Sequence, residues 1–305
     1  MDNIIKIGVD KDNEDRLDLF LSEELEGISR SAIQKLIKNG NITVNDNVKK
    51  SSYLLKEGDQ VLVSIPEDEP IKILPQDIAL DLLYEDDDIA VVNKPQNMVV
   101  HPAPGNYSNT LVNALLYQID DLSMINGIIR AGIVHRLDKD TSGLLLIAKN
   151  ELAHSRLIKQ FKDRTVLKEY ITLVHNNIKE NGIINKPIGR NPKNRKKMAV
   201  VANGKEAVTI YEVLERYQKY TLLKIELKTG RTHQIRVHMA QMNHPIVGDP
   251  VYSNGKNEFK IDKQLLHAYK IGFIHPRRNE YMEFKKDLPD GFKKIIDNLN
   301  KRVIK

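Results

Sequence analysis

The chain of 305 residues contains no cysteine. This absence excludes disulfide bonds, thiolate nucleophiles and every cysteine-ligated metal site. Three common signature patterns are missing as well: the P-loop pattern GxxxxGK followed by Ser or Thr, the dinucleotide pattern GxGxxG, and the zinc-protease pattern HExxH. Any chemistry must therefore come from oxygen, imidazole or amine groups.

Long apolar runs are also missing. No stretch approaches the roughly 20 apolar residues that a membrane-spanning helix needs. The opening MDNIIKIGVDKDNEDR lacks the basic start and apolar core of a secretory signal. The hydrophobic content of 41% and the charged content of 29% are typical of a globular protein. We therefore expect a cytoplasmic protein without a membrane partner.

Positive charge is in modest excess. Lysine and arginine number 47 against 41 aspartates and glutamates, which gives a net charge of +6. This balance favours polyanionic partners without requiring them, because lysine-rich proteins with no nucleic-acid role are common. The length exceeds a typical domain of roughly 100–200 residues and predicts two domains, one large and one small.

The N-terminal part predicts two short helices followed by a small sheet. The first helix ends near Gly27, and the second begins at the favourable N-cap Ser29 and ends at Gly40. Strands follow in ITVND and DQVLVSI, with a turn at 45–47. The apolar helix positions are Leu17, Phe20, Leu21, Leu25, Ile33, Leu36 and Ile37. The second helix also carries Arg30, Lys35 and Lys38, which either contact phosphates or form a solvated face.

Prolines at positions 66, 70 and 75 mark a linker, because proline cannot sit inside a helix or a central strand. We therefore assign residues 1–13 to an N-terminal extension, 14–75 to the small domain with its linker, and 78–305 to the large domain. A strand hairpin is expected in LLYEDDDIAVVNKP.

The large domain predicts an α+β architecture. Its strand-like runs are IVHRLD, GLLLIAK, EYITLVH, TIYEVLERY and YTLLKIELK, and its helical runs are SNTLVNALLYQI and ELAHSRLIKQF. Too few helices separate the strands for a regular parallel series, so we expect a mixed, mainly antiparallel sheet.

One candidate site lies in residues 132–148, where a charged loop is expected between two apolar strands. Such a loop is held rigidly, as a catalytic carboxylate requires. Asp138 is the first candidate because two groups that can carry positive charge precede it in an apolar setting. Alternatively, Asp138 only pairs with Arg136 or Lys139. Asp140, Thr141 and Ser142 are expected only to shape the turn.

A second cluster, residues 227–249, concentrates positive charge after Gly230. An extended segment would place Arg231 and His233 on one face, whereas a helix would place His233 and Arg236 together. Phosphate recognition suits these residues, and one arginine could instead hold the candidate aspartate. A metal site is disfavoured because the histidines lie between arginines. Its ligands would be His233, His238, His244 and Asp249.

The motifs resemble two known families. Residues 14–65 resemble an S4 domain, a small RNA-binding module, through the RLD opening, the SRSAIQKLIKNG helix and the closing EGD. HRLDKDTSGLLLIAK resembles the catalytic motif of RluA-type pseudouridine synthases, in the branch that carries an S4 domain and modifies large-subunit ribosomal RNA. VVNKPQNMVVHPAPGN, VLKEYITLVHN, LKTGRTHQIRVHMAQMNHPIVGDPVY and LLHAYKIGFIHP fit the same family in the same order.

The resemblance implies roles for individual residues. Asp138 corresponds to the essential aspartate, Arg136 to the arginine that displaces or replaces the flipped nucleotide, and Tyr170 to the tyrosine that stacks on the base. Arg231 corresponds to the basic residue that pairs with the aspartate, and Ile235 to an apolar residue near the pocket. The S4 resemblance implies that Arg30, Lys35 and Lys38 contact RNA. Asn93, Lys94 and Pro95 match a motif interpreted as structural.

The implied reaction breaks the N1 glycosidic bond of uridine, turns the base and joins C5 to the same sugar carbon. No atoms are gained or lost, so we expect no cofactor and no metal. A carboxylate can attack covalently, or stabilise cationic character at C1′ and move a proton. The expected partner is RNA, as large-subunit ribosomal RNA or an assembling particle, bound by a monomer. The rival functions are a non-catalytic RNA-binding or ribosome-assembly protein and a hydrolase that uses Asp138 and His135.

Overall fold

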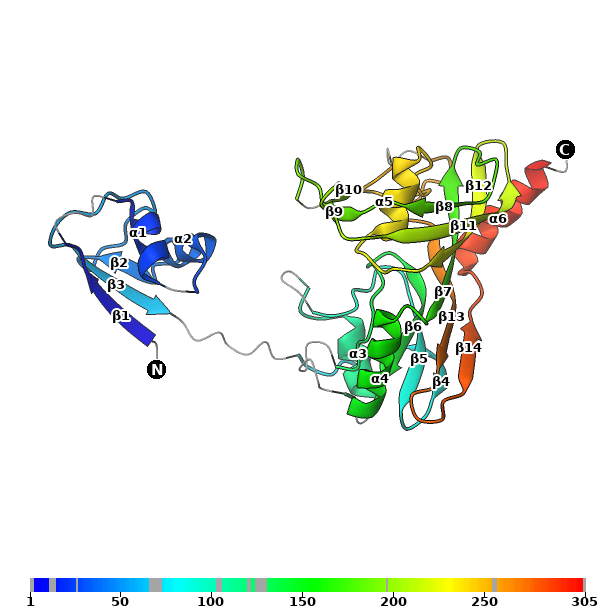
Figure 1. Ribbon diagram of the computed structural model, residues 1–305, viewed down its shortest axis with the longest axis horizontal. Coiled ribbons are helices and arrows are strands. Elements are labelled where there is room, and N and C mark those ends of the chain that lie inside the picture. The colour runs from blue at the N-terminus through cyan, green and yellow to red at the C-terminus, as the bar shows by residue number, and fades with distance from the viewer. Residues whose placement is uncertain are drawn as a thin grey trace. The chain divides into compact units, whose positions relative to one another are not determined.

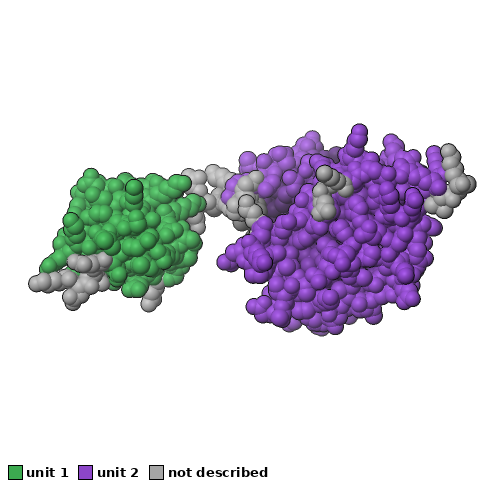
Figure 2. Space-filling model, turned by 90° about the horizontal axis from the view of Figure 1, so that it is seen from above, with its two compact units in different colours: residues 1–71 green, residues 72–305 purple. Residues whose placement is uncertain are grey.

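Strand pairing and internal contacts divide the chain into two units, residues 1–71 and residues 72–305 (Figures 1 and 2). The computed structural model describes residues 3–10, 15–25, 27–65, 73–102, 106–119, 122–123, 131–195, 197–253 and 257–303. Two of the three prolines on which the linker prediction rests, at positions 66 and 70, lie outside these residues. No helix among the described residues is long and apolar enough to cross a membrane.

The N-terminal unit packs two helices on a three-stranded antiparallel sheet of order β1-β3-β2. Its elements are β1 (Asn3–Gly8), α1 (Leu17–Glu24), α2 (Arg30–Lys38), β2 (Ile42–Val44) and β3 (Gln60–Ile65). The predicted helices and strands are confirmed. The assignment of residues 1–13 to an N-terminal extension, in contrast, was wrong for Asn3–Gly8. These residues form β1, which pairs with β3 along its whole length.

Local sequence explains where these elements end. The Ser29 hydroxyl accepts a hydrogen bond from the backbone N–H of Ala32 at 3.3 Å and so caps α2. Gly40 follows α2 with a φ of +79°, a conformation that glycine adopts without strain. Asn45 and Asp46 adopt positive φ in the turn after β2, which confirms the turn predicted at 45–47.

The C-terminal unit is built on a mixed sheet of nine strands in the order β4-β5-β6-β13-β7-β12-β11-β8, with β14 paired to β13. All pairs are antiparallel except β6 with β13. The α+β prediction with a mainly antiparallel sheet is therefore confirmed. The strands are β4 (Asp81–Glu85), β5 (Ile89–Lys94), β6 (Ser142–Ala148), β7 (Leu167–His175), β8 (Gly182–Asn185), β11 (Val208–Arg216), β12 (Tyr220–Leu227), β13 (Leu266–Ile274) and β14 (Tyr281–Lys285).

Within the described residues, four helices and a small hairpin accompany this sheet (Figure 1). They are α3 (Leu111–Gln118), α4 (Glu151–Lys162), α5 (Gln234–Gln241), α6 (Asp290–Val303), and the strands β9 (Ile188–Arg190) and β10 (Met198–Val200). The two predicted helices, α3 and α4, are confirmed, as is the hairpin of β4 and β5.

The predicted strand IVHRLD was wrong. Its residues run along the edge of β6 and form only an isolated bridge, between Ile133 and Ile147. The backbone N–H of Leu146 donates to Nε2 of His135 at 2.9 Å, where a strand neighbour would present a carbonyl oxygen. A side chain thus replaces part of the backbone ladder, so the chain can leave the sheet before Asp138.

β6 begins directly after this loop, and its first two residues pair with β13. Gly143 pairs with Ala268 and has a φ of +116°. A Cβ atom at this position would lie 2.3 Å from the carbonyl oxygen of Ala268. Only glycine therefore allows the two parallel strands to approach so closely beside the candidate site.

Candidate active site

Asp138 lies in an open cavity of the C-terminal unit. The walls come from the loop before β6, from β7 and β13, and from the segment between β12 and the first turn of α5. Among the residues that line it are Arg136, Leu137, Asp138, Tyr170, Leu227, Arg231, His233, Ile235, Arg236 and Leu266. The structure therefore brings together all five candidate residues of the large domain.

The loop that carries Asp138 is anchored by the buried side chain of Lys94. Its ammonium group donates to the carbonyl oxygens of Pro95 at 2.7 Å, Met98 at 3.0 Å and Lys139 at 3.0 Å. Burial lowers the pKa of Lys94 to about 7, and the nearby carboxylates of Asp140 and Asp138 act in the opposite direction. The structural role of Lys94 is therefore to hold this loop in place, because one of its hydrogen bonds reaches Lys139, the residue next to Asp138.

Arg236 binds Asp138. One guanidinium nitrogen, Nη1, lies 3.1 Å from Oδ2 of Asp138, while Nε and Nη2 bind the two oxygens of Asp249 at 2.7 and 2.9 Å. Asp249 is fully buried and also accepts the backbone N–H groups of Val251 and Tyr252. A bidentate pair of this kind orients a guanidinium in one plane. Asp249 thus aims Arg236 at Asp138.

The prediction that Arg231 pairs with Asp138 was wrong. Its Nε donates to the backbone carbonyl of Glu206 at 2.8 Å, although the side chain still lines the cavity. The reason is local conformation: His233 has a φ of +58° and α5 begins only at Gln234, so Arg231 precedes the helix and Arg236 lies on it. His233 and Arg236 both approach Oδ2 of Asp138, as the helical alternative predicted, although His233 itself precedes the helix.

Only one of the two oxygens of the Asp138 carboxylate accepts a hydrogen bond from the described residues. The side chain is 17% exposed, and Oδ1 has no hydrogen-bond partner among the described residues. His233 lies near the other oxygen, with Nε2 4.0 Å from Oδ2, and its Nδ1 shares a hydrogen bond with the hydroxyl of Tyr252 at 2.9 Å. Burial lowers the pKa of His233, while the charge of Asp138 opposes this effect. One carboxylate oxygen therefore remains for a ligand.

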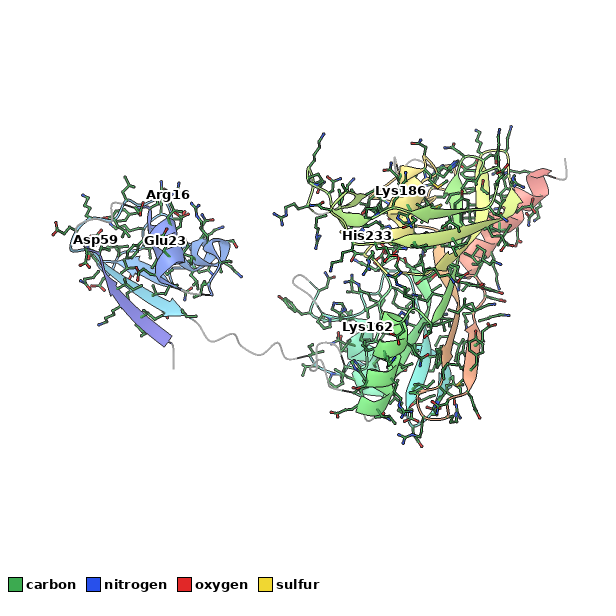
Figure 3. All side chains as sticks on the ribbon, viewed as in Figure 1. Arg16, Glu23, Asp59, Lys162, Lys186 and His233 are labelled. Atoms are coloured by element: carbon green, nitrogen blue, oxygen red, sulfur yellow. The ribbon has the colours of Figure 1, made fainter. Side chains whose placement is uncertain are left out.

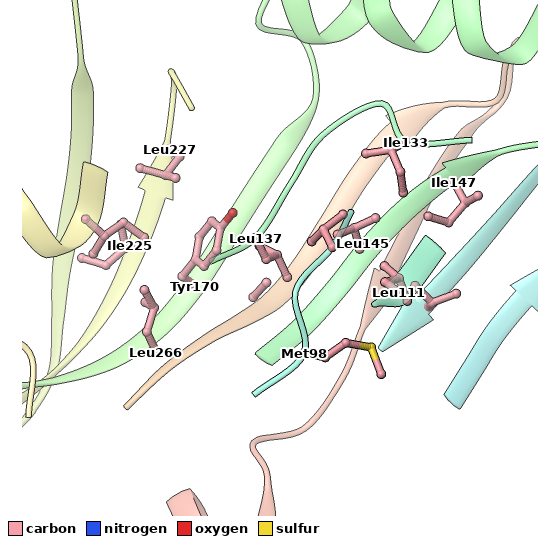
Figure 4. Close-up of a cluster of buried hydrophobic side chains, with 14 of the residues drawn as sticks. Met98, Leu111, Ile133, Leu137, Leu145, Ile147, Tyr170, Ile225, Leu227 and Leu266 are labelled. Carbon is pink, nitrogen blue, oxygen red and sulfur yellow. The ribbon is translucent and has the colours of Figure 1, made fainter. Parts of the chain in front are cut away.

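Apolar side chains also line the cavity, and several of them belong to a buried hydrophobic cluster (Figure 4). The ring of Tyr170 lies between Leu137 and Ile225, with Leu227 and Leu266 close by. Burial raises the pKa of Tyr170 well above its ordinary value, and the charge of Asp138 adds to this effect. The phenol is therefore neutral at physiological pH and offers a flat apolar face beside the carboxylate.

The other two candidates from the large domain differ in exposure. Ile235 is 4% exposed and lines the cavity from the first turn of α5. The side chain of Arg136 lines the cavity, is exposed, and has no ion-pair partner among the described residues. Arg136 is thus available to a ligand, whereas Ile235 contributes shape.

His135 is held in a structural role. Its Nε2 accepts the backbone N–H of Leu146, and its ring stacks on Phe161 with centroids 4.7 Å apart. Burial lowers the pKa of His135 to about 3, so the imidazole is neutral. A nitrogen that accepts a backbone N–H cannot also accept a proton from water, which removes the basis for a hydrolase built on Asp138 and His135.

The four residues weighed as metal ligands have other partners. His238 bonds to Thr209 and to the carbonyl of Lys186, His244 bonds to the carbonyl of His175, and Asp249 holds Arg236. A different group, Asp86, Asp88 and His275, has ligand atoms within 4.8 Å of one another. Arginines 277 and 278 bind its carboxylates at 2.7–3.3 Å, so a cation would have to displace them.

The cations predicted to contact RNA in the N-terminal unit lie on α2. Lys35 and Lys38 are exposed in its last turn. Arg30 is partly committed, because its guanidinium binds the fully buried Asp18 at 2.9–3.0 Å. Arg30 therefore stabilises the fold even though 45% of its side chain is exposed.

Comparison with known proteins identifies this arrangement. Residues 88–241 match the family model of RNA pseudouridylate synthase, and residues 15–61 match that of the S4 domain. An uncharacterized RNA pseudouridine synthase of Bacillus subtilis is 48% identical over 288 residues, which cover 94% of this chain and 95% of the relative. The chain belongs to the RNA pseudouridylate synthase family. It is an isomerase with an S4 RNA-binding domain.

More distant relatives agree. Ribosomal large subunit pseudouridine synthase D of Escherichia coli is 40% identical, with 92% of this chain and 90% of the relative covered. The solved structure of human RNA pseudouridylate synthase domain containing 1 is 25% identical and superposes with a TM-score of 0.57, covering 77% of this chain and 98% of the human one. The resemblance seen in the motifs is thus confirmed.

Proposed function

We propose that this enzyme isomerises specific uridines of large-subunit ribosomal RNA, with Asp138 as the catalytic carboxylate acting on a base flipped out of its stack. The supporting observation is that the carboxylate of Asp138 is held through one oxygen and left open at the other. Arg236 binds one oxygen of Asp138, and the other has no partner among the described residues of the cavity. A charge held this way is oriented before substrate arrives, which is what electrostatic or nucleophilic catalysis requires.

The cavity supplies what the isomerisation needs. N1–C1′ must break, the base must turn, and C5 must bond to C1′ and then release its proton. Asp138 either attacks covalently or stabilises positive character at C1′. Removing a base from the stack costs a few kcal/mol, and stacking on an aromatic ring offsets this cost. We assign the stacking to Tyr170 and the filling of the vacated position to the exposed Arg136.

Large-subunit ribosomal RNA is proposed as substrate on two grounds. The relatives in Escherichia coli and Neisseria meningitidis carry the name ribosomal large subunit pseudouridine synthase D. The S4 unit adds a second RNA-binding module, in which Lys35 and Lys38 are exposed for phosphate contacts. The cytoplasmic location follows from this substrate. The proposal uses groups of a single chain only, and an isomerisation without gain or loss of atoms needs no metal or cofactor.

The test maps pseudouridines in large-subunit ribosomal RNA by carbodiimide-dependent primer-extension stops, with and without the gene, and then with purified full-length protein on the unmodified transcript. We expect discrete stops that depend on the protein, with no change in RNA mass. Release of free uracil would indicate a hydrolase. RNA binding without any new stop would indicate a non-catalytic binding protein.

A further inference from the structure

A second cleft adjoins the reaction cavity, and cations dominate its charged lining. Its walls come from the segment 134–136, the end of α4, the start of β7 and the residues after β12. Figure 3 labels Lys162, the last residue of α4. Within the described part of the chain, no aspartate or glutamate lines this cleft. Its cations are Arg136, Lys162, Arg164, Lys168, Lys228 and Arg231.

Lys168 is the most unusual of these cations. It is 9% exposed, and its ammonium group lies 5.7 Å from the centre of the Phe161 ring. No carboxylate within the described residues pairs with it. Burial lowers the pKa of Lys168 to about 8, the positive charges of Lys228 and Arg164 add to this effect, and the negative charge of Glu226 opposes it. A partly desolvated cation repelled by its neighbours costs stability until an anion binds.

The other cations are only partly neutralised. Arg164 pairs with Glu206 and Lys228 with Glu226, but all four side chains are at least 30% exposed, where ion pairs contribute little. Lys162 is exposed and has no ion-pair partner in the described ranges. The cleft thus keeps an excess of positive charge.

The cleft is continuous with the reaction cavity. Arg136, Tyr170, Leu227, Gly230 and Arg231 line both. A polymer whose flipped base stacks on Tyr170 must continue away from that point. The cationic cleft is an exit whose charge complements a phosphate backbone.

We propose that this cleft binds the phosphate backbone of the RNA strand that flanks the target uridine. The inference rests on the proposed function for the nature of the ligand. Lysines and arginines recognise phosphates whatever the base sequence, so a cleft with an excess of these residues contributes affinity rather than choice of uridine. Arg136 and Arg231 then belong to both sites, which explains why Arg231 lines the cavity without binding Asp138.

The test measures binding of the full chain to a large-subunit ribosomal RNA transcript across a salt series. The variant combines Lys162→Gln, Lys168→Met and Lys228→Gln, and methionine preserves the packing of the Lys168 stem on Phe161. Removal of one lysine–phosphate interaction reduces the slope of log affinity against log salt by about 0.7–0.9. We expect the slope to fall by about 2 and the affinity at moderate salt to fall at least tenfold.

A matched control is Lys294→Gln on α6, an exposed lysine without an ion-pair partner in the described residues. It should leave both affinity and salt slope unchanged. The charge-preserving variant Lys228→Arg should keep most of the affinity that Lys228→Gln removes. Thermal unfolding of each variant checks the fold, and the exposed Lys228→Gln keeps the test valid where Lys168→Met disturbs packing.

The outcomes separate this inference from the proposed function. Unchanged affinity and salt slope in the folded triple variant, with pseudouridine still formed by the wild-type chain, would overturn the cleft alone. Weakened binding by the triple variant, with no pseudouridine formed by the wild-type chain on any transcript, would support the cleft and overturn the function. Equal weakening by Lys228→Arg and Lys228→Gln would also contradict phosphate recognition.

Discussion

Asp18 in the N-terminal unit and Asp138 in the C-terminal unit are both bound by arginine, but they are occupied to different degrees. Asp18 is fully buried, and Arg16, Arg30 and Gln34 donate to both of its oxygens at 2.6–3.3 Å. Asp138 is 17% exposed and is bound by Arg236 through one oxygen. A carboxylate without remaining acceptor capacity stabilises a fold, whereas one with an open oxygen can act on a ligand.

Asp249 extends the comparison within the C-terminal unit. It resembles Asp18 because it is buried and accepts from a guanidinium and two backbone N–H groups. Its partner Arg236 also holds Asp138. Asp249, both of whose oxygens accept hydrogen bonds, thus positions Arg236. Arg236 in turn orients Asp138, which accepts through one oxygen only. We infer that Asp249 is a positioning residue.

After loss of Asp138 itself, the largest effect is expected from Arg236→Gln. Removing the guanidinium leaves Asp249 buried without its charge partner, which costs about 3–5 kcal/mol of stability. Turnover should fall roughly 100- to 1,000-fold because Asp138 loses its orienting charge. Single-turnover rates and denaturant unfolding measure the two effects.

Arg236→Lys keeps the positive charge. It tests whether the guanidinium orients Asp138 if Arg236→Gln does not fold. Arg231→Gln is the matched comparison, because Arg231 lines the cavity but donates to a backbone carbonyl. Its single-turnover rate at saturating RNA should stay well above that of Arg236→Gln. The reverse order would restore Arg231 as the partner of Asp138.

Asp249→Asn should have an intermediate effect. The amide keeps the volume but cannot accept two guanidinium bonds as an ionised carboxylate does. We expect the single-turnover rate at saturating RNA to fall roughly 10- to 100-fold, as for other residues that orient a catalytic group, while RNA affinity stays within about threefold. Weaker binding with an unchanged rate would contradict a positioning role.

Asp18→Asn should affect stability but not chemistry. It weakens three hydrogen-bonded contacts in the N-terminal unit and should cost about 1–3 kcal/mol. Hydrogen exchange of peptides from residues 15–65 should accelerate, while peptides from the C-terminal unit should not change. Asp46→Asn, in an exposed turn where asparagine tolerates the positive φ, is the control. Equal acceleration in both variants would remove the structural role of Asp18.

The smallest effect is a pH dependence of the N-terminal unit. Although burial alone would raise it, hydrogen bonds from Gln34, Arg16 and Arg30 hold the pKa of Asp18 at about 2, below its ordinary value of 3.8. The resulting stabilisation is complete above pH 3.8 and is lost as the pH falls towards 2, because the unfolded state takes up a proton first. Hydrogen exchange between pH 4 and 2 should reveal this loss, and Asp18→Asn should lack it.

Sequence patterns predicted most of the fold because apolar periodicity and turn residues act locally. The capping by Ser29 and the hairpin of β4 and β5 follow from neighbouring residues. The failures were not local. His135 takes a place in the β6 ladder that backbone alternation cannot reveal, and the pairing of β1 with β3 joins segments too far apart in the sequence for a local pattern to show it.

The candidate site shows the same division. Family motifs placed Asp138, Tyr170 and Ile235 in one cavity. Arg236 was missed as the partner of Asp138 because 98 residues separate them and the choice depends on where α5 begins. The sequence of the GRTHQIR segment was compatible with both an extended and a helical conformation. Asp249 had a detectable signal, an aspartate 13 residues after Arg236, but no local rule connects the two.

The most direct test of the catalytic assignment is the single-turnover rate of Asp138→Asn on ribosomal RNA tritiated at C5 of uridine, since C5 releases its hydrogen when it bonds to the sugar. Asparagine keeps the volume and can still accept a hydrogen bond from Arg236 but carries no charge. We expect tritium release to fall at least about 1,000-fold, while RNA affinity and unfolding midpoint stay near those of the wild-type chain. Tritium release within about tenfold of wild type would contradict the catalytic role of Asp138.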